Sequence, residues 1–276
     1  MAAFADLHLH THHSDGVRTP AEVVSLTKER GLAAIAITDH DNLAAFAEAE
    51  PLARKAGIEL VPGVELSIEW EGVDIHLLAY SFDPEDAALC SKLQLCRDTR
   101  ARRGEMMVEK LDAVGVPISL ERVRQLCGKG AMGRPHVARC LVENGVVASI
   151  DEAFDRFLSP GMPGWVEKER ISLSEAIEMV RAAGGVTSIA HPALYPDGER
   201  LVRAMLPLGV DGIEVLHPNH DEEASQRFAA IADEHAVMRT GGSDDHGFAD
   251  RRTLGSVRVP LEQVRGIFDR WRRRAR

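Results

Sequence analysis

The stretch Asp6-Leu7-His8-Leu9-His10-Thr11-His12-His13-Ser14-Asp15-Gly16, near the start of the chain, decides the fold. Leucine and histidine alternate in its first half, and alternate residues of a β-strand lie on the same face. Leu7 and Leu9 would therefore face a core, while the imidazoles of His8 and His10 point together to the other side. This spacing is typical of a metal site at a strand end, although two solvent-facing histidines on an edge strand would share it.

Six more short apolar segments follow, and helical patterns separate most of them. We expect strands at Phe4–Leu9, Ala34–Thr38, Glu59–Leu66, Val73–Ala79, Val186–Ala190, Gly212–Leu216 and Val237–Thr240. The helix between the first two strands is well marked, because Thr19 can cap it and Pro20 suits its first position. Further helices are expected at Leu43–Lys55, Leu173–Ala183, Glu199–Leu208, Asp221–Glu234 and Leu261–Arg274. Strands that alternate with helices predict a parallel sheet, and about seven such units predict an α/β barrel.

The alternation stops between about Pro84 and Pro160. Only helical patterns occur there, at Asp86–Val114, Leu120–Leu126, Pro135–Asn144 and Ile150–Phe157. We interpret this stretch as a small all-helical insertion carried by the barrel. The predicted domains are therefore a barrel of residues 1–84 and 161–276, and an insertion of residues 85–160.

Composition excludes several classes of protein. The 276 residues carry a formal net charge of −10, which argues against coating duplex nucleic acid. The four cysteines show no C-x-x-C spacing and are expected to be reduced thiols, which indicates a cytoplasmic protein. Neither a secretory signal nor an apolar run of about 18 residues is visible, so we expect no membrane partner.

Acidic and histidine side chains recur where the expected strands end. In α/β barrels these positions face the mouth of the active site. Nine such groups could converge there: His8, His10, Asp15, His40, Glu65, His76, His191, Asp244 and His246. Nine groups suit two or three divalent ions, and mixed nitrogen and oxygen ligands fit Mn²⁺, Fe²⁺ or Zn²⁺ better than Ca²⁺.

Some of these residues have simpler interpretations. His76 could be a core histidine with its hydrogen bonds satisfied, and Asp39 and Asp41 could cap the next helix. Glu65 is harder to explain in this way, because a carboxylate buried without a partner in an apolar strand is costly.

In combination, the motifs resemble those of the PHP (polymerase and histidinol phosphatase) superfamily. The matching segments are His8-x-His10, Thr38-Asp39-His40, Gly63-x-Glu65, His76, Ala190-His191-Pro192 and Ser243-Asp244-x-His246. The resemblance implies a distorted (β/α)7 barrel with a phosphoesterase site that holds two or three metal ions. It also implies three ligand sets: His8, His10, Glu65 and Asp244 for one ion, Glu65, His76 and His191 for a second, and Asp15, His40 and His246 for a third.

Within the superfamily, the insertion resembles that of bacterial nucleoside 3′,5′-bisphosphate phosphatases and a related 5′-to-3′ exoribonuclease. This resemblance implies substrate contacts from Arg100, Arg103, Arg134 and His136, and arginine forks bind phosphate oxygens well. Glu65, His191 and Asp244 are expected to be catalytic as metal ligands. His12 and His217 are candidates for protonating the leaving oxygen.

The expected reaction is metal-dependent hydrolysis of a phosphate monoester. By resemblance, the substrate is the 3′-phosphate of a nucleoside 3′,5′-bisphosphate, with short 5′-phosphorylated RNA as a further substrate. Two alternatives stay open: a phosphatase for another small monoester such as histidinol phosphate, and a metal-binding module without activity.

Overall fold

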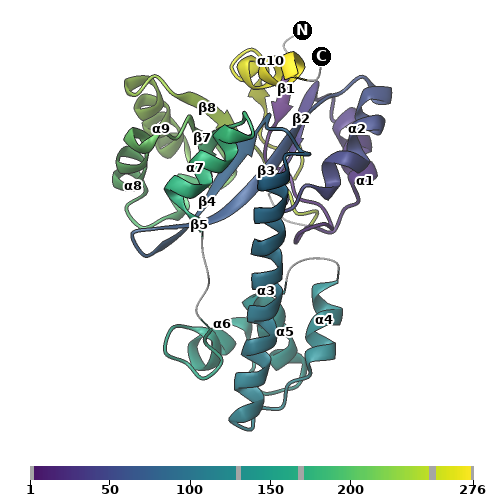
Figure 1. Cartoon of the computed structure of the whole chain (residues 1–276), viewed down its shortest axis with the longest axis vertical. Coiled ribbons are helices and arrows are strands. Elements are labelled where there is room, and N and C mark those ends of the chain that lie inside the picture. The colour runs from purple at the N-terminus through teal and green to yellow at the C-terminus, as the bar shows by residue number, and fades with distance from the viewer. Residues whose placement is uncertain (1–2, 129–131, 167–170, 249–252, 275–276) are drawn as a thin grey trace. The chain divides into compact units, whose positions relative to one another are not determined.

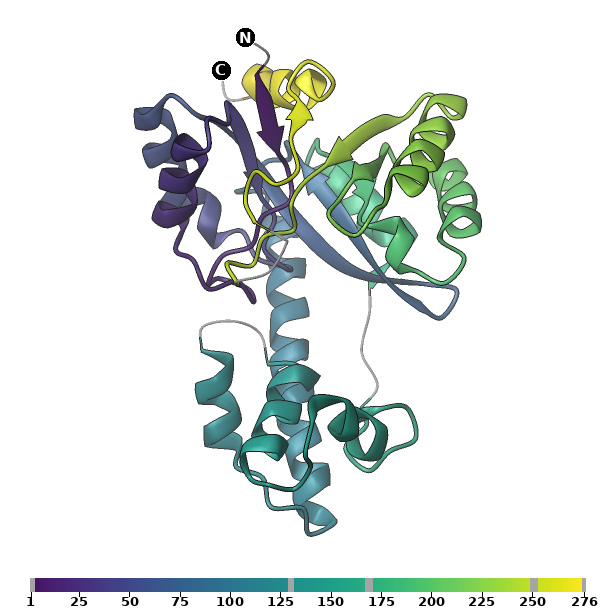
Figure 2. The ribbon, with the colours of Figure 1, turned by 180° about the vertical axis from the view of Figure 1, so that it is seen from behind.

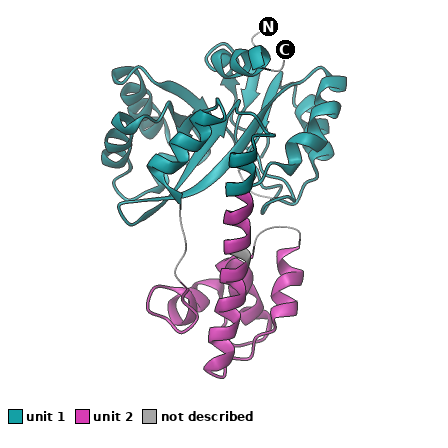
Figure 3. Ribbon diagram, viewed as in Figure 1, with its two compact units in different colours: residues 1–92, 170–276 teal, residues 93–169 magenta. Residues whose placement is uncertain are grey.

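The computed structural model describes residues 3–128, 132–166, 171–248 and 253–274, with the backbone alone at positions 100 and 101. Contacts divide the chain into two compact units, unit 1 (residues 1–92 and 170–276) and unit 2 (residues 93–169), which Figure 3 colours separately. The expected domains, a barrel of residues 1–84 and 161–276 and an insertion of residues 85–160, stay a prediction.

Unit 1 is built on one curved sheet (Figure 1). Its strands run in the order β8-β7-β6-β4-β3-β2-β1-β9, and β5 pairs with β3. The bounds are β1 Phe4–Asp6, β2 Ala34–Ile37, β3 Glu59–Trp70, β4 Val73–Tyr80, β5 Ile171–Ser172, β6 Val186–Ile189, β7 Gly212–Leu216, β8 Met238–Gly241 and β9 Val259–Pro260.

The first strand is shorter than expected because the chain after it turns to the far end of the sheet. The Leu7 amide donates to the Gly241 carbonyl at 3.2 Å, and the His10 amide donates to the Asp245 carbonyl at 3.0 Å. Leu9 and Asp245 form an isolated parallel bridge. These bonds join the segment after β1 to the end of β8 and the residues that follow it, so the sheet nearly closes on itself. The prediction of a distorted (β/α)7 barrel is confirmed.

The expectation of a purely parallel sheet is wrong at its centre. β4 runs antiparallel to both β3 and β6, whereas β1, β2 and β3 are parallel, as are β6, β7 and β8. Only Glu71 and Gly72 join β3 to β4, and both have positive φ, 49° and 80°. Such a pair makes the two-residue turn that suits a hairpin. The hairpin also extends β3 to Trp70, four residues beyond the expected end.

Helices pack against both faces of this sheet. They are α1 Pro20–Glu29, α2 Ala44–Ala56, α7 Leu173–Ala182, α8 Gly198–Met205, α9 Glu222–Glu234 and α10 Arg265–Arg274, with short turns η2 Pro192–Leu194 and η3 Leu206–Leu208. The alternating residues of β2 show which core lies on each face of the sheet. Ala34 and Ala36 lie in a core with other strands and α10, whereas Ile35 and Ile37 lie in a second core with α1 and α2. Figure 2 shows β9 beside β1 and, on opposite flanks, the pairs α1–α2 and α8–α9.

The described part of unit 2 contains helices joined by turns and no strand, as expected for the insertion. The long helix α3 (Ala87–Ala113) begins in unit 1 and continues into unit 2, where α4 Leu120–Cys127, α5 Arg134–Glu143, α6 Ile150–Ala153 and η1 Phe154–Leu158 follow. Unit 2 has its own apolar core, which includes Met107, Leu111, Val137 and Leu141. Among the described helices of both units, none is long and apolar enough to cross a bilayer.

Candidate metal centre

The structure brings the predicted ligands together inside unit 1. His8 and His10 follow β1, His40 follows β2, Glu65 lies within β3 and His76 within β4. Asp15 lies in the turn between β1 and α1. Three ligands come from the other half of the sheet: His191 follows β6, and Asp244 and His246 follow β8. Nearly every strand thus contributes a polar group, and the side chains meet around one carboxylate.

That carboxylate is Glu65, whose side chain is 1% exposed. Its Oε2 atom lies 3.2 Å from His8 Nε2, 3.1 Å from His10 Nε2 and 3.3 Å from His40 Nδ1. Three imidazole nitrogens therefore converge on one oxygen. A carboxylate oxygen with so many nitrogen neighbours is suited to share cations with them.

The second oxygen of Glu65 has a similar environment. Its Oε1 atom lies 2.8 Å from His76 Nδ1 and 3.1 Å from His191 Nε2. His76 was open to interpretation as a core histidine, but its side chain is 32% exposed and faces this carboxylate. Glu65 thus links two groups of imidazoles, as a bridging ligand would.

Asp244 provides a second carboxylate. Its Oδ1 atom lies 3.5 Å from His8 Nε2, 3.3 Å from His10 Nε2 and 3.5 Å from His246 Nδ1. Asp244 and His191 both have positive φ, 51° and 29°. Residues other than glycine seldom adopt this conformation, and it concentrates at functional sites where the surroundings enforce it.

Asp15 completes a more exposed group. Its Oδ1 atom lies 3.3 Å from His246 Nε2, and its Oδ2 atom lies 3.6 Å from His40 Nε2. The Asp15 side chain is 45% exposed, in contrast to Glu65. The centre therefore runs from a buried end at Glu65 to an end that solvent reaches at Asp15.

The nitrogens of this cluster fit a metal ion. Among the described residues, five buried imidazole nitrogens have no hydrogen-bond partner: His8 Nε2, His10 Nε2, His13 Nε2, His40 Nδ1 and His191 Nδ1. Such atoms are costly unless something occupies their lone pairs. Three of them face Glu65 Oε2, and three overlapping sets of donor atoms lie close enough to ligate ions: His8, His10 and Glu65; His40, Glu65 and His76; and His10, Asp15, His40 and His246.

Electrostatics within the cluster are strongly coupled. Burial disfavours charge on Glu65, but the surrounding imidazoles, His40 foremost, hold its pKa well below its usual value. Burial also disfavours a charged His10, but the neighbouring carboxylates of Asp244 and Glu65 raise its pKa to about 10. Burial lowers the pKa of His40 to about 3. Without cations, protonated imidazole therefore balances part of the carboxylate charge.

Metal binding is therefore expected to release protons. A histidine that ligates a metal must be neutral, and the raised pKa of His10 keeps it protonated at pH 8 before the metal binds. Calorimetric titration of metal into chelator-stripped protein, in buffers of different ionisation enthalpy, should show net proton release at pH 8. A binding enthalpy that does not change with the buffer would contradict this assignment.

Sequence reasoning missed one residue of the centre. Glu214 lies in β7 and is fully buried; its Oε1 atom lies 2.9 Å from His8 Nδ1, and its Oε2 atom accepts the His191 amide at 2.7 Å. Metal-ligating histidines usually donate their second ring N–H to such a partner, which fixes the tautomer and the ring orientation. The sequence could have indicated Glu214, because its carboxylate interrupts the apolar strand Gly212–Leu216 just as Glu65 interrupts its own strand.

The capping interpretation of Asp39 and Asp41 is wrong. Asp39 accepts from the Thr11 amide and the Ser14 hydroxyl, both at 2.7 Å, and from the Thr11 hydroxyl at 2.6 Å. Asp41 accepts from the Ser67 amide at 3.1 Å. The residue at the N-cap of α2 makes no side-chain cap bond. Both carboxylates instead hold neighbouring backbone around the centre.

The two candidates for proton donor differ in position. His217 is 3% exposed, and its Nε2 atom lies 3.4 Å from Asp244 Oδ2. His12 contacts other residues. Its Nδ1 atom lies 3.3 Å from the Arg18 carbonyl oxygen, and its ring centroid lies 4.3 Å from that of His13. The donor atoms of His12 group with His13 and Glu48, outside the cluster around Glu65.

The predicted substrate contacts lie in unit 2. The Arg103 Nε donates to the Val166 carbonyl at 2.8 Å, and its guanidinium lies 5.4 Å from the Trp165 ring centroid. Arg134 lies 5.3 Å from the same centroid and 5.4 Å from that of Phe154. In His136, Nδ1 accepts the Gly133 amide at 3.1 Å, and the side chain of Arg100 lies outside the described residues. Two predicted arginines thus flank one tryptophan, and their contact with substrate stays a prediction.

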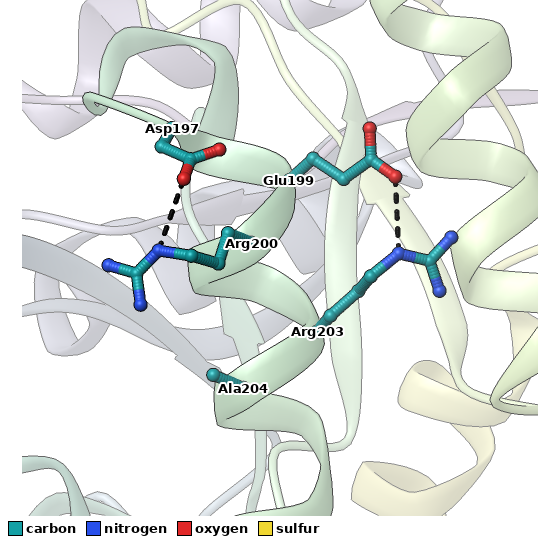
Figure 4. Close-up of a pocket in the computed structure, with 5 residues that line it drawn as sticks. All are labelled: Asp197, Glu199, Arg200, Arg203 and Ala204. Carbon is teal, nitrogen blue, oxygen red and sulfur yellow. Dashed lines mark hydrogen bonds and ion pairs between the residues drawn. The ribbon is translucent and has the colours of Figure 1, made fainter.

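A separate surface cavity of about 480 Å³ lies on α8 (Figure 4). Its charged side chains pair with one another: Arg200 Nε lies 3.1 Å from Asp197, and Arg203 Nε lies 3.1 Å from Glu199. Its lining shares no residue with the cluster around Glu65. We assign it no role in the chemistry.

Comparison with known proteins agrees with this geometry. A family model described as the PHP domain matches residues 6–111. A 3′,5′-nucleoside bisphosphate phosphatase of Chromobacterium violaceum is 36% identical over 87% of this chain and 86% of its own. The 5′-3′ exoribonuclease Rnm of Escherichia coli is 32% identical over 98% of this chain and 94% of its own.

A solved structure is also similar to this chain. The crystal structure from Bifidobacterium adolescentis, whose name describes a metal-dependent phosphoesterase, matches with a TM-score of 0.83 at 33% identity. The match covers 96% of both chains, so it includes the helical unit as well as the barrel. Fold, cluster and relatives agree with the resemblance inferred from the motifs. The chain belongs to the PHP-domain family of metal-dependent phosphoesterases.

Proposed function

We propose that this chain hydrolyses a phosphate monoester with two or three divalent ions, Mn²⁺, Fe²⁺ or Zn²⁺. The observation that carries the proposal is the buried carboxylate of Glu65, which has five imidazole nitrogens within 3.3 Å. Cations at such a centre activate water and neutralise charge on the phosphoryl oxygens. Mixed imidazole and carboxylate ligands suit these three metals.

We assign the ligands to three groups. His8, His10, Glu65 and Asp244 would hold one ion, and Glu65, His76 and His191 would hold a second. Asp15, His40 and His246 would hold a third ion, at the end of the centre where Asp15 is partly exposed. Glu65 belongs to both of the first two groups, and the ions held there would supply positive charge for one phosphoryl group.

His217 is proposed as a positioning residue for Asp244. The Asn219 amide donates to His217 Nδ1 at 3.1 Å, so the ring proton resides on Nε2 and points to Asp244 Oδ2. His217 would thereby fix the carboxylate while its other oxygen, Oδ1, faces the ligand imidazoles. We do not assign a catalytic role to His12, because its donor atoms belong to another group.

For the substrate we propose a nucleoside 3′,5′-bisphosphate, cleaved at its 3′-phosphate. Support comes from the Chromobacterium relative, named for that activity, and from the arginines of unit 2. The second candidate is short 5′-phosphorylated RNA, which would require cleavage of a diester. The exoribonuclease relative favours it, since that match spans 98% of this chain.

A substrate panel separates these possibilities. With metal-loaded protein, adenosine 3′,5′-bisphosphate should be hydrolysed with a kcat/KM at least about tenfold above that of a generic aryl phosphate, a difference of about 1.4 kcal/mol. The panel should include a short 5′-phosphorylated RNA and histidinol phosphate. Equal kcat/KM for the bisphosphate and the aryl phosphate would refute the nucleotide assignment while leaving the phosphoesterase intact.

The role of Arg134 can be tested in the same assay. If Arg134 binds ground-state phosphate, Arg134→Ala should raise KM for the bisphosphate about tenfold or more and change kcat little, because a charge-assisted hydrogen bond is lost. Arg139→Ala is the matched control, since Arg139 lies on the same helix and is exposed. A fall in kcat with unchanged KM would contradict the binding role.

A further inference from the structure

A second cluster of metal-ligating side chains lies outside the centre. His12 and His13 occupy the turn between β1 and α1, and Glu48 lies on α2. His13 Nε2 lies 2.9 Å from Glu48 Oε1, and the His12 and His13 ring centroids are 4.3 Å apart. One donor atom from each of the three residues lies within 4.8 Å of the others. None of the three belongs to a ligand set around Glu65.

The tautomer of His12 is set for metal binding. Its Nδ1 atom lies 3.3 Å from the Arg18 carbonyl oxygen, which only accepts hydrogen bonds, so Nδ1 carries the ring proton. Its Nε2 atom therefore keeps a free lone pair. An imidazole whose Nδ1–H donates to a backbone carbonyl is the usual arrangement of a histidine that ligates through Nε2. Arg18 is itself held, since its guanidinium pairs with the buried Asp245.

The backbone of His13 is held on both sides. Its amide donates to the Thr11 hydroxyl at 3.2 Å, and its carbonyl accepts from the Asn42 side chain at 2.7 Å. Thr11 is fixed in turn by Asp39. The His13 imidazole is therefore presented from an ordered turn, so little ordering would remain for a cation to impose.

His13 Nε2 shares a property with the ligands of the main centre. It is one of the five buried imidazole nitrogens that have no hydrogen-bond partner among the described residues, and the other four all belong to ligands of that centre. Glu48 Oε1 is close, but it does not complete a hydrogen bond with His13 Nε2. A cation between the two atoms would satisfy both.

From these contacts we propose that His12, His13 and Glu48 form an additional cation site, separate from the phosphoesterase centre. Two imidazoles and one carboxylate match Zn²⁺ best among the common divalent ions. The Glu48 side chain is 54% exposed, so water can supply the remaining ligand. A bound cation would join the turn after β1 to helix α2, and this role does not depend on the reaction at the centre.

The test counts zinc ions. Chelator-stripped full-length protein is titrated with Zn²⁺ in competition with a chromophoric chelator, for wild type, Glu48→Gln and His13→Gln. Each variant should bind one equivalent fewer than wild type. His235→Gln is the matched control: His235 directly follows α9, is partly exposed, contributes to no ligand set, and should leave the count unchanged. Wild-type stoichiometry and affinity in both variants would overturn the proposal.

A second measurement shows which site has lost the ion. Glu48→Gln with excess Mn²⁺ should keep the wild-type kcat for an aryl phosphate within about twofold, and its melting temperature without metal should match wild type. Zn²⁺ should raise the melting temperature of wild type more than that of Glu48→Gln. A variant that loses both a zinc equivalent and its activity would assign that ion to the main centre and refute the separate site.

Discussion

Glu65→Gln is expected to lower kcat/KM for an aryl phosphate by about 10³-fold or more, which corresponds to about 4 kcal/mol of transition-state stabilisation. The amide nitrogen of glutamine would replace one oxygen that faces imidazole nitrogens on either side of Glu65. It carries no negative charge and has no lone pair for a cation. Metal analysis of the purified variant should therefore show fewer ions per chain, and excess metal should not restore the rate.

Glu69→Gln is the matched control for this experiment. Glu69 lies on the same strand, pairs in register with Asp74 near the hairpin turn, and belongs to no ligand set. The same change there should leave metal content and kcat/KM close to wild type. If Glu65→Gln kept its full metal content and rate, Glu65 would not be the bridging ligand, and the proposed centre would fail with it.

Local signals predicted most of the fold. Thr19 and Pro20 form the predicted start of α1, and in the structure Thr19 also makes both hydrogen bonds of a capping box with Glu22. Burial of both faces of Ala34–Ile37 matches a continuous apolar run. The hairpin between β3 and β4 was missed because Glu71-Gly72 is a weak turn signal beside Asn-Gly or Asp-Gly. Strand direction depends on that turn, so the antiparallel pairing was missed as well.

The site residues were predictable where a charged or polar side chain stands in an otherwise apolar segment. Glu65 lies in an apolar strand and His8 lies beside leucines, so both side chains need polar partners. Most of the expected strands end with a polar group, and this indicated where those partners lie. Contacts between distant segments were not predictable. Arg103 and Trp165 are 62 positions apart in the sequence, and no local pattern shows that the guanidinium covers the ring.

Glu214→Gln is expected to weaken metal binding by about 10- to 100-fold, the usual effect of losing a partner that orients a ligand. Glu214 accepts from His8 Nδ1 and from the His191 amide through different oxygens. Glutamine has only one oxygen. If that oxygen serves His191, the amide donor faces His8 Nδ1, which forces the proton of His8 onto Nε2 and removes its lone pair. If the amide is flipped, the buried His191 N–H loses its acceptor, which costs about 1–3 kcal/mol.

The two glutamine variants should respond differently to metal concentration, and this difference distinguishes a ligand from the residue that orients it. Glu214→Gln leaves every proposed ligand in place, so excess metal should restore most of its rate, with the loss expressed as a higher metal Kd. Glu65→Gln lacks a ligand atom and should stay inactive under the same conditions. Competition with a chromophoric chelator gives the Kd, and initial rates across metal concentrations give the rescue. A wild-type Kd for Glu214→Gln would show that His8 keeps its tautomer without this carboxylate, and failure of rescue would place Glu214 in the reaction itself.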